Sequence, residues 1–88
     1  MNSADKKKLR AVAHALKPVV IIGQSGLTAA VLAETEQALE CHQLIKVKIR
    51  AERNERKLIS EKICTQTGAL LIQTIGQIAV IYRFNPAK

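Results

Sequence analysis

The chain has 88 residues, with 14 Lys and Arg against seven Asp and Glu, so its net charge is +7 and its pI is near 9.9. This length predicts a single domain over residues 1–88 with a modest core. A small domain with this excess of positive charge usually binds a polyanion, either nucleic acid or an anionic membrane surface. The alternative is that the positive charge only keeps the protein soluble.

Several classes of protein are disfavoured by the sequence. Its first ten residues, MNSADKKKLR, lack the apolar centre of a signal peptide, and no apolar run is long enough to cross a bilayer. Cys41 and Cys64 form no disulfide framework, and Cys41 and His42 are adjacent rather than at metal-ligand spacing. We therefore expect a cytoplasmic protein that is not an enzyme, without metal, cofactor, small-molecule substrate or membrane contact.

The first predicted helix covers residues 4–16. Its apolar face is formed by Leu9, Val12, Ala13 and Leu16. Ser3 or Asp5 is the expected N-cap, and Pro18 ends the helix. Its basic residues lie beside the apolar face and lack balancing acids after Asp5; they are Lys6, Lys7, Lys8, Arg10 and Lys17, with His14 in the same stripe. A solvated helix face is the alternative reading of that stripe.

A strand and a second helix follow, joined by the loop GQSG. Residues 19–22, VVII, lie between Pro18 and Gly23 and predict a strand that is buried on both faces. Residues 28–42 predict a helix with Thr28 as its N-cap.

The C-terminal half predicts three strands and one helix. Residues 44–50, LIKVKIR, alternate and predict a strand with one wet face that carries Lys46, Lys48 and Arg50, a basic row that a solvated sheet face would also explain. Residues 54–67 predict a helix that ends at Gly68, with Leu58, Ile59 and Ile63 facing inward. Strands at 69–75 and 78–84 should form a hairpin around Gly76 and Gln77. Residues 50–57 mix both signs, with Glu52 and Arg56 four apart, and predict a solvated helix start.

The predicted order of elements is α-β-α-β-α-β-β. Strands separated by helices indicate crossover connections, whereas the final hairpin is antiparallel. The fold class is therefore α/β, in two layers, with a mixed four-stranded sheet and helices packed on it.

The loop GQSG is the strongest candidate for a binding site. It precedes a helix whose first turn, unlike that of the third helix, contains no acid, so the unpaired N–H groups and the positive end of the dipole are available to an anion. Gly23 and Gly26 lack a Cβ, and a phosphate backbone could approach closely. A lone G-x-x-G pattern is more often only a tight strand-to-helix turn, and this one matches neither a P-loop nor a dinucleotide fingerprint.

Several motifs in order resemble the CRM domain, the chloroplast RNA splicing and ribosome maturation module whose stand-alone bacterial members are called YhbY-like. They are AHALKP, IGQSGLT, HQLIKVKI and TGALLIQTIGQIAVIYR, within about residues 8–84. The resemblance implies a fold similar to the C-terminal domain of bacterial translation initiation factor three. It also implies a G-x-x-G loop like that of KH domains, which clamp nucleic-acid backbone. Gln43 departs from the pattern, where Glu is expected.

The expected function is non-catalytic binding of ribosomal RNA or of precursors of the large ribosomal subunit, by a monomer. The expected RNA-binding residues are Gly23, Gln24, Ser25, Gly26, Thr28, Lys6, Lys7, Lys8, Arg10, Lys17, Lys46 and Lys48. The alternative is a protein–protein module that docks on a ribosomal protein or translation factor through its exposed sheet.

Overall fold

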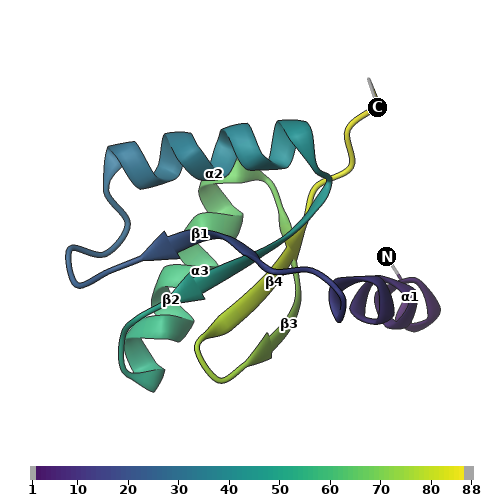
Figure 1. Ribbon diagram of the computed structural model, residues 1–88, viewed down its shortest axis with the longest axis horizontal. Helices are drawn as coiled ribbons and strands as arrows, with labels where there is room; N and C mark the ends of the chain where they lie inside the picture. Colours follow the sequence, from purple (N-terminus) through teal and green to yellow (C-terminus); the bar gives the residue numbers. More distant parts are fainter. Residues whose placement is uncertain (1, 87–88) are drawn as a thin grey trace.

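The computed structural model describes residues 2–86, which form three helices and four strands in the predicted order (Figure 1). The elements are α1 (Ser3–Ala13), β1 (Pro18–Ile22), α2 (Ala29–Cys41), β2 (Leu44–Ile49), α3 (Arg53–Thr67), β3 (Leu70–Ile75) and β4 (Ile78–Tyr82). The predicted fold class is confirmed. No helix within the described residues is long and apolar enough to cross a membrane.

The four strands form one mixed sheet with the order β1-β2-β4-β3. β1 and β2 are parallel, as expected for strands joined by a helical crossover, and β4 is antiparallel to both β2 and β3. The predicted hairpin joins β3 to β4 through Gly76, whose φ of +55° suits glycine. Parallel pairing makes β1 and β2 end at the same edge of the sheet, which positions the candidate site.

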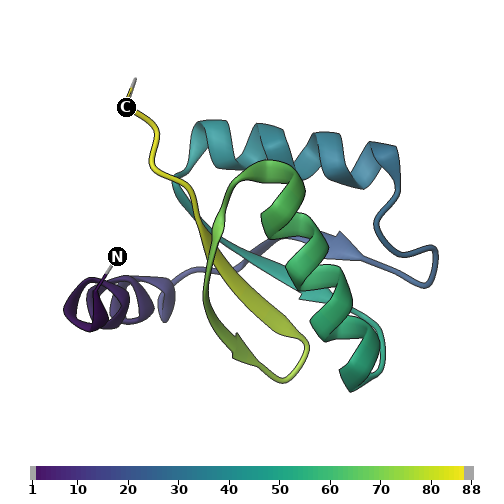
Figure 2. The ribbon, with the colours of Figure 1, turned by 180° about the vertical axis from the view of Figure 1, so that it is seen from behind.

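The main core lies between one face of the sheet and the helices α2 and α3 (Figure 2). α2 covers β1 and β2, whereas α3 contacts β3. The buried side chains of this core are aliphatic, as a chain with only one Phe and one Tyr requires; they are Val20, Ile22, Leu39, Ile45, Val47, Ile49, Ile63, Ala69, Ala79 and Ile81. Gly68 ends α3 in a left-handed conformation, φ +75°, as predicted, and its N–H donates to the Cys64 carbonyl at 2.9 Å.

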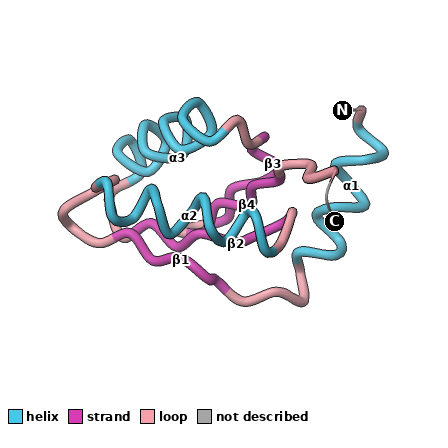
Figure 3. Tube along the Cα trace, turned by 90° about the horizontal axis from the view of Figure 1, so that it is seen from above, coloured by secondary structure: helices cyan, strands magenta, loops and turns pink. Residues whose placement is uncertain are grey.

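The opposite face of the sheet is covered by α1 at one end only. Ala13 packs there with Ile72 and Val80. Figure 3 shows α1 at the end of the molecule that lies away from the loop between β1 and α2. The rest of this face, which we call the open face, exposes Val19 (48%), Ile21 (54%) and Ile75 (60%).

The prediction for the first helix is wrong at both ends. The N-cap is Asn2, whose side chain accepts from the Asp5 N–H at 2.9 Å, and α1 ends at Ala13. Half of its predicted apolar face is exposed, Val12 to 58% and Leu16 to 36%. The reason is the limited contact, since α1 covers only one end of β2, β4 and β3 and its outward side has no partner within residues 2–86.

Two further burial predictions are wrong. β1 is not buried on both faces: it is an edge strand in which Val20 and Ile22 face the core, whereas Val19 and Ile21 lie on the open face. Leu58 of α3 does not face inward and is 65% exposed. In both places no helix or strand of the described chain packs over these side chains, so they stay exposed.

Candidate nucleic-acid interface

The loop between β1 and α2 is closed by its own backbone. The Gly26 N–H donates to the Gly23 carbonyl, and the Thr28 N–H donates to the Gly26 carbonyl, both at 3.1 Å. Gly26 has a φ of +71°, which non-glycine residues rarely adopt. The Gly26 N–H is therefore already used within the turn, and other amides of this segment must serve any bound anion.

Five backbone N–H groups beside this turn have no hydrogen-bond partner within residues 2–86; they belong to Gln24, Ser25, Leu27, Ala29 and Ala30. Thr28 is the N-cap, as predicted, and its Oγ1 accepts from the Val31 N–H at 3.2 Å. The first turn of α2 contains no acid, whereas that of α3 contains Glu55. Unpaired amides and an uncompensated helix dipole together favour an anion at this position.

Gly23 has no structural requirement for glycine. Its φ does not lie in the left-handed region, and an added Cβ would meet no atom within 4 Å. A side chain at this position would project into open space beside the loop. The absence of a Cβ keeps the main chain accessible to a large anion such as a phosphate backbone.

The cations that the sequence analysis selected do not form one patch with the loop. Those of α1 and Lys17 lie toward the opposite end of β1 from Gly23, so the strand separates the two groups (Figure 1). Lys46 and Lys48 lie half-buried on the open face between them. In the β1–β2 register Lys48 pairs with Ile21 and Lys46 with Pro18, so only Lys48 lies near the loop.

Three cations at the same end as the loop were not among the expected RNA-binding residues; they are Arg50, which the alternation placed on the wet face with Lys46 and Lys48, and Arg53 and Lys57 of α3. The Arg50 N–H donates to the Ile22 carbonyl at 2.9 Å, so the start of the β2–α3 connection lies beside the start of the loop. The expected solvated pair of Glu52 and Arg56 is absent from the ion pairs of residues 2–86; Arg56 Nη1 instead donates to the Ala51 carbonyl at 2.7 Å. The sequence could have predicted this proximity, because parallel strands end at the same edge of a sheet and bring the segments that follow them together.

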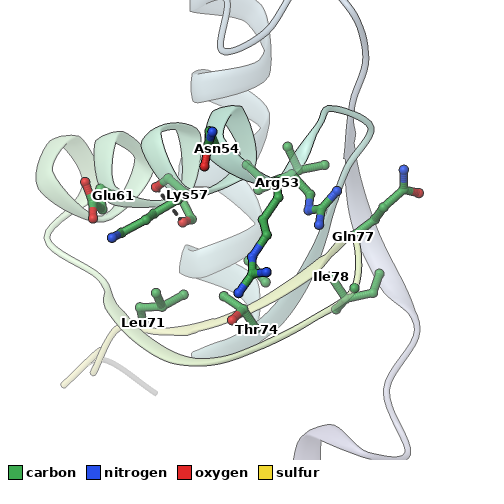
Figure 4. A pocket seen from close by; sticks show the side chains of 13 residues that line it. Arg53, Asn54, Lys57, Glu61, Leu71, Thr74, Gln77 and Ile78 are labelled. Atoms are coloured by element: carbon green, nitrogen blue, oxygen red, sulfur yellow. Dashed lines mark hydrogen bonds between the residues drawn. The ribbon is translucent and has the colours of Figure 1, made fainter.

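A groove of about 880 Å³ opens between α3 and the β3–β4 hairpin (Figure 4). Arg53, Arg56 and Lys57 line it, and Glu61 is the only acid among its lining residues. It exists because the buried residues of α3 begin at Ser60, so the first half of the helix does not pack tightly on the sheet. A net positive groove thus lies at the end of the sheet that carries the glycine loop.

The groups that could support catalysis or bind a metal are few. No group of three or more His, Cys, Asp or Glu side chains suited to a metal ion occurs among the described residues. Burial raises the pKa of the Cys64 thiol, which keeps it protonated near neutral pH. The candidate interface offers backbone amides, cations and apolar surface.

Comparisons with known proteins find relatives that match nearly the whole chain. A Pseudomonas aeruginosa protein named "probable RNA-binding protein" is 45% identical over 87 residues, which cover 98% of this chain and 84% of that protein. A Haemophilus influenzae protein named "RNA-binding protein" is 48% identical over 84 residues, which cover 94% of this chain and 85% of that protein. A solution structure of a hypothetical Staphylococcus aureus protein, described as a candidate RNA-binding protein, matches with a TM-score of 0.85 at 30% identity, over 97% of this chain and 90% of its own.

The family model of the CRS1 / YhbY (CRM) domain matches residues 1–83, nearly the whole chain. The motifs that pointed to this family lie before β1, at the glycine loop, at β2 and at the final hairpin. The chain belongs to the CRS1 / YhbY (CRM) domain family.

Proposed function

We propose that this protein is a non-catalytic RNA-binding protein that holds RNA backbone at the loop of Gly23–Gly26 and the start of α2. The observation that carries the proposal is the group of five unpartnered N–H donors in and beside that loop, at a helix start without an acid. Phosphate oxygens are the acceptors that suit such donors. The names of its relatives support RNA as the polyanion.

The finer proposal is that the RNA is ribosomal RNA, bound in precursors of the large subunit in the cytoplasm, by a single 88-residue domain acting as a monomer. The net charge of +7 supports a partner with a dense negative charge. Crosslinking in cells followed by sequencing of the bound RNA tests this. Enrichment of large-subunit rRNA supports the proposal, whereas an even distribution over cellular RNA contradicts it.

Two variants at one position test the loop. Asp and Asn have nearly the same shape, and both tolerate the left-handed conformation that Gly26 adopts, so both variants should fold. Only Asp places a negative charge beside the bound phosphates. We expect Gly26→Asp to lose at least about tenfold in RNA affinity, about 1.4 kcal/mol, relative to Gly26→Asn. Equal affinities of two folded variants would exclude the loop as the phosphate site.

The salt dependence of RNA binding gives an independent measurement. If roughly four to six phosphates of a single strand are neutralised, the logarithm of the affinity should fall with that of the salt concentration at a slope of about −3 to −4. Fluorescence anisotropy with a labelled single-stranded RNA measures this slope. An affinity that does not change with salt contradicts the proposal.

A second candidate function is docking on a ribosomal protein or translation factor, which the open face favours. Val19, Ile21 and Ile75 expose apolar side chains there, beside Lys46 and Lys48. Protein contacts are the usual use of such surface. This function predicts that purified rRNA binds no better than an unrelated polyanion, and that Ile21→Ser abolishes capture of the partner while leaving the RNA affinity unchanged.

A further inference from the structure

The groove between α3 and the hairpin has a composition that differs from that of the glycine loop. Its volume of about 880 Å³ is within the range of about 300–1,000 Å³ of small-ligand sites. Leu71 and the half-buried Ile78 supply apolar surface above the buried Ile49 and Ala79, and Asn54 and Gln77 supply side-chain amides. Arg53 and Lys57 add positive charge. Figure 4 shows Asn54 and Lys57 on the α3 side and Leu71 and Gln77 on the hairpin side.

From this composition we propose that the groove receives unpaired nucleotides of the RNA whose backbone is held at the glycine loop. The apolar side chains would contact the faces of bases, the amides of Asn54 and Gln77, which lie at different positions along the groove (Figure 4), would each contact a base edge, and the cations of α3 would contact the phosphates. This inference rests on the proposed function and adds to it a preference for unpaired over duplex RNA.

The amides of Asn54 and Gln77 distinguish a nucleobase from a simple anion. Neither side chain has a hydrogen-bond partner within residues 2–86. An amide offers both a donor and an acceptor, which is what the edge of a base requires, and single-stranded bases expose those edges. A simple anion such as phosphate or a carboxylate only accepts hydrogen bonds, so it would leave the acceptor oxygens of these two amides unused.

The position of the groove fits a strand that is already held at the loop. At the end of β2, the Ile49 N–H donates to the Gln77 carbonyl at 2.7 Å, and the Arg50 N–H donates to the Ile22 carbonyl at 2.9 Å. One short backbone segment thus contacts both the hairpin turn that borders the groove and the last residue before the loop. Ile22 and Gln77 are separated by two strand spacings, about 10 Å. One RNA strand could reach both sites.

The walls of the groove are held by contacts that do not involve its amides. Arg56 Nη1 donates to the Ala51 carbonyl at 2.7 Å, and Ser60 Oγ donates to the Lys57 carbonyl at 2.9 Å. Asn54 and Gln77 are exposed, so their replacement by Ala leaves these bonds intact. The double variant Asn54→Ala/Gln77→Ala is therefore expected to fold like the wild type.

The first test compares this double variant with Gln37→Ala/Gln66→Ala, which removes two exposed amides of α2 and α3 that do not line the groove. The probe is a labelled single-stranded 12-mer, tested beside the same sequence in a duplex. We expect wild type and control to prefer the single strand by about tenfold, as for a pair of base contacts of 1–3 kcal/mol, and the groove variant to lose that preference. The salt slope should not change, since no charge is removed.

The results separate this inference from the proposed function. If the groove variant keeps the wild-type preference while Gly26→Asp abolishes binding, the groove inference is wrong and RNA binding at the loop stands. If wild-type protein binds no RNA, both are wrong.

A second test uses the wild-type protein and small probes. In a ¹H–¹⁵N titration, each of the four nucleoside monophosphates should shift the side-chain amide signals of Asn54 and Gln77, and at least one should do so at concentrations where inorganic phosphate does not. Equal shifts with inorganic phosphate, or complete competition by an oligoglutamate peptide, would assign the groove to anions in general and overturn the inference.

Discussion

Arg83 donates from Nη1 to Glu36 Oε2 at 2.7 Å and so joins the segment after β4 to α2. The same nitrogen donates to the Thr67 carbonyl at 2.9 Å, which adds the end of α3. Its other terminal nitrogen contacts Glu40 at 3.0 Å, but that carboxylate is 67% exposed and contributes little. One guanidinium, 19% exposed, thus ties three elements together at the end of the molecule opposite the glycine loop.

We expect Arg83→Met to lower the free energy of unfolding by about 2 kcal/mol, since hydrogen bonds to charged groups contribute about 1.5–3 kcal/mol each and this site is partly exposed. Arg50→Met makes the same chemical change at an exposed position where the side chain has no partner within residues 2–86, and should change stability by less than about 0.5 kcal/mol. Urea unfolding followed by circular dichroism measures both. Equal losses in the two variants would contradict the structural role of Arg83.

Gly23 and Gly68 should respond to alanine in opposite ways. Gly68 ends α3 with a φ of +75°, so Gly68→Ala should cost about 1–2 kcal/mol of stability and leave RNA affinity unchanged. At Gly23 the backbone is unstrained and a Cβ meets no atom within 4 Å, so Gly23→Ala should preserve stability. Because that Cβ would project beside the loop, we expect it to weaken RNA binding. A Gly23→Ala protein with wild-type affinity would show that the RNA backbone does not approach there.

Features that depend on neighbouring residues in the chain could be predicted from the sequence. Thr28 caps α2 and Gly68 ends α3 because each acts on the backbone of its own helix. Lys46 and Lys48 share a face because a strand alternates.

Features that depend on a second layer could not be predicted. The run VVII does not indicate that β1 is an edge strand with one open face. In the same way, the residues around Leu58 and Val12 do not indicate that these two side chains are left uncovered. The same difference between local and tertiary features applies to the candidate site. The glycine loop was visible as a local pattern, whereas the position of Arg53 and Lys57 at the same end of the sheet depends on the parallel pairing of β1 and β2 and on the groove between α3 and the hairpin.

The two cysteines should differ in reactivity. Cys41 is exposed at the end of α2, whereas Cys64 is half-buried and burial raises the pKa of its thiol. Since the thiolate is the nucleophile, iodoacetamide should modify Cys41 first in the folded protein, and urea should make the two rates similar. Mass spectrometry of peptides over time measures this. Faster modification of Cys64 in the folded state would contradict its burial.

The raised pKa of Cys64 also determines the direction in which stability changes with pH. The folded state binds the proton of Cys64 more tightly than the unfolded chain does. The stability that arises from this tighter proton binding is therefore complete below the pKa of the unfolded thiol. It is lost as the pH rises through the pKa of the thiol in the folded protein. Cys64→Ala should remove this alkaline component, whereas Cys41→Ala should leave it in place.

The separation of the basic residues into groups predicts different effects on RNA binding. Lys48 pairs with Ile21, next to the residue before the loop, so Lys48→Gln should remove a phosphate contact, reduce the salt slope by about 0.7 and raise the dissociation rate. Lys7 and Lys8 are exposed on α1 at the far end of the molecule. Lys7→Gln/Lys8→Gln should therefore lower mainly the association rate, through loss of long-range attraction.

Stopped-flow measurements of association and dissociation with a labelled RNA separate these effects. Lys62→Gln, an exposed lysine on α3 outside the groove, controls for the loss of one charge. Because α1 and the loop do not touch, the effects of Lys7→Gln/Lys8→Gln and Gly26→Asp on the binding free energy should add within about 0.5 kcal/mol. A larger coupling, or a higher dissociation rate in the α1 variant, would mean that one RNA contacts both ends of the molecule and that the path between them runs over Lys46 and Lys48 on the open face.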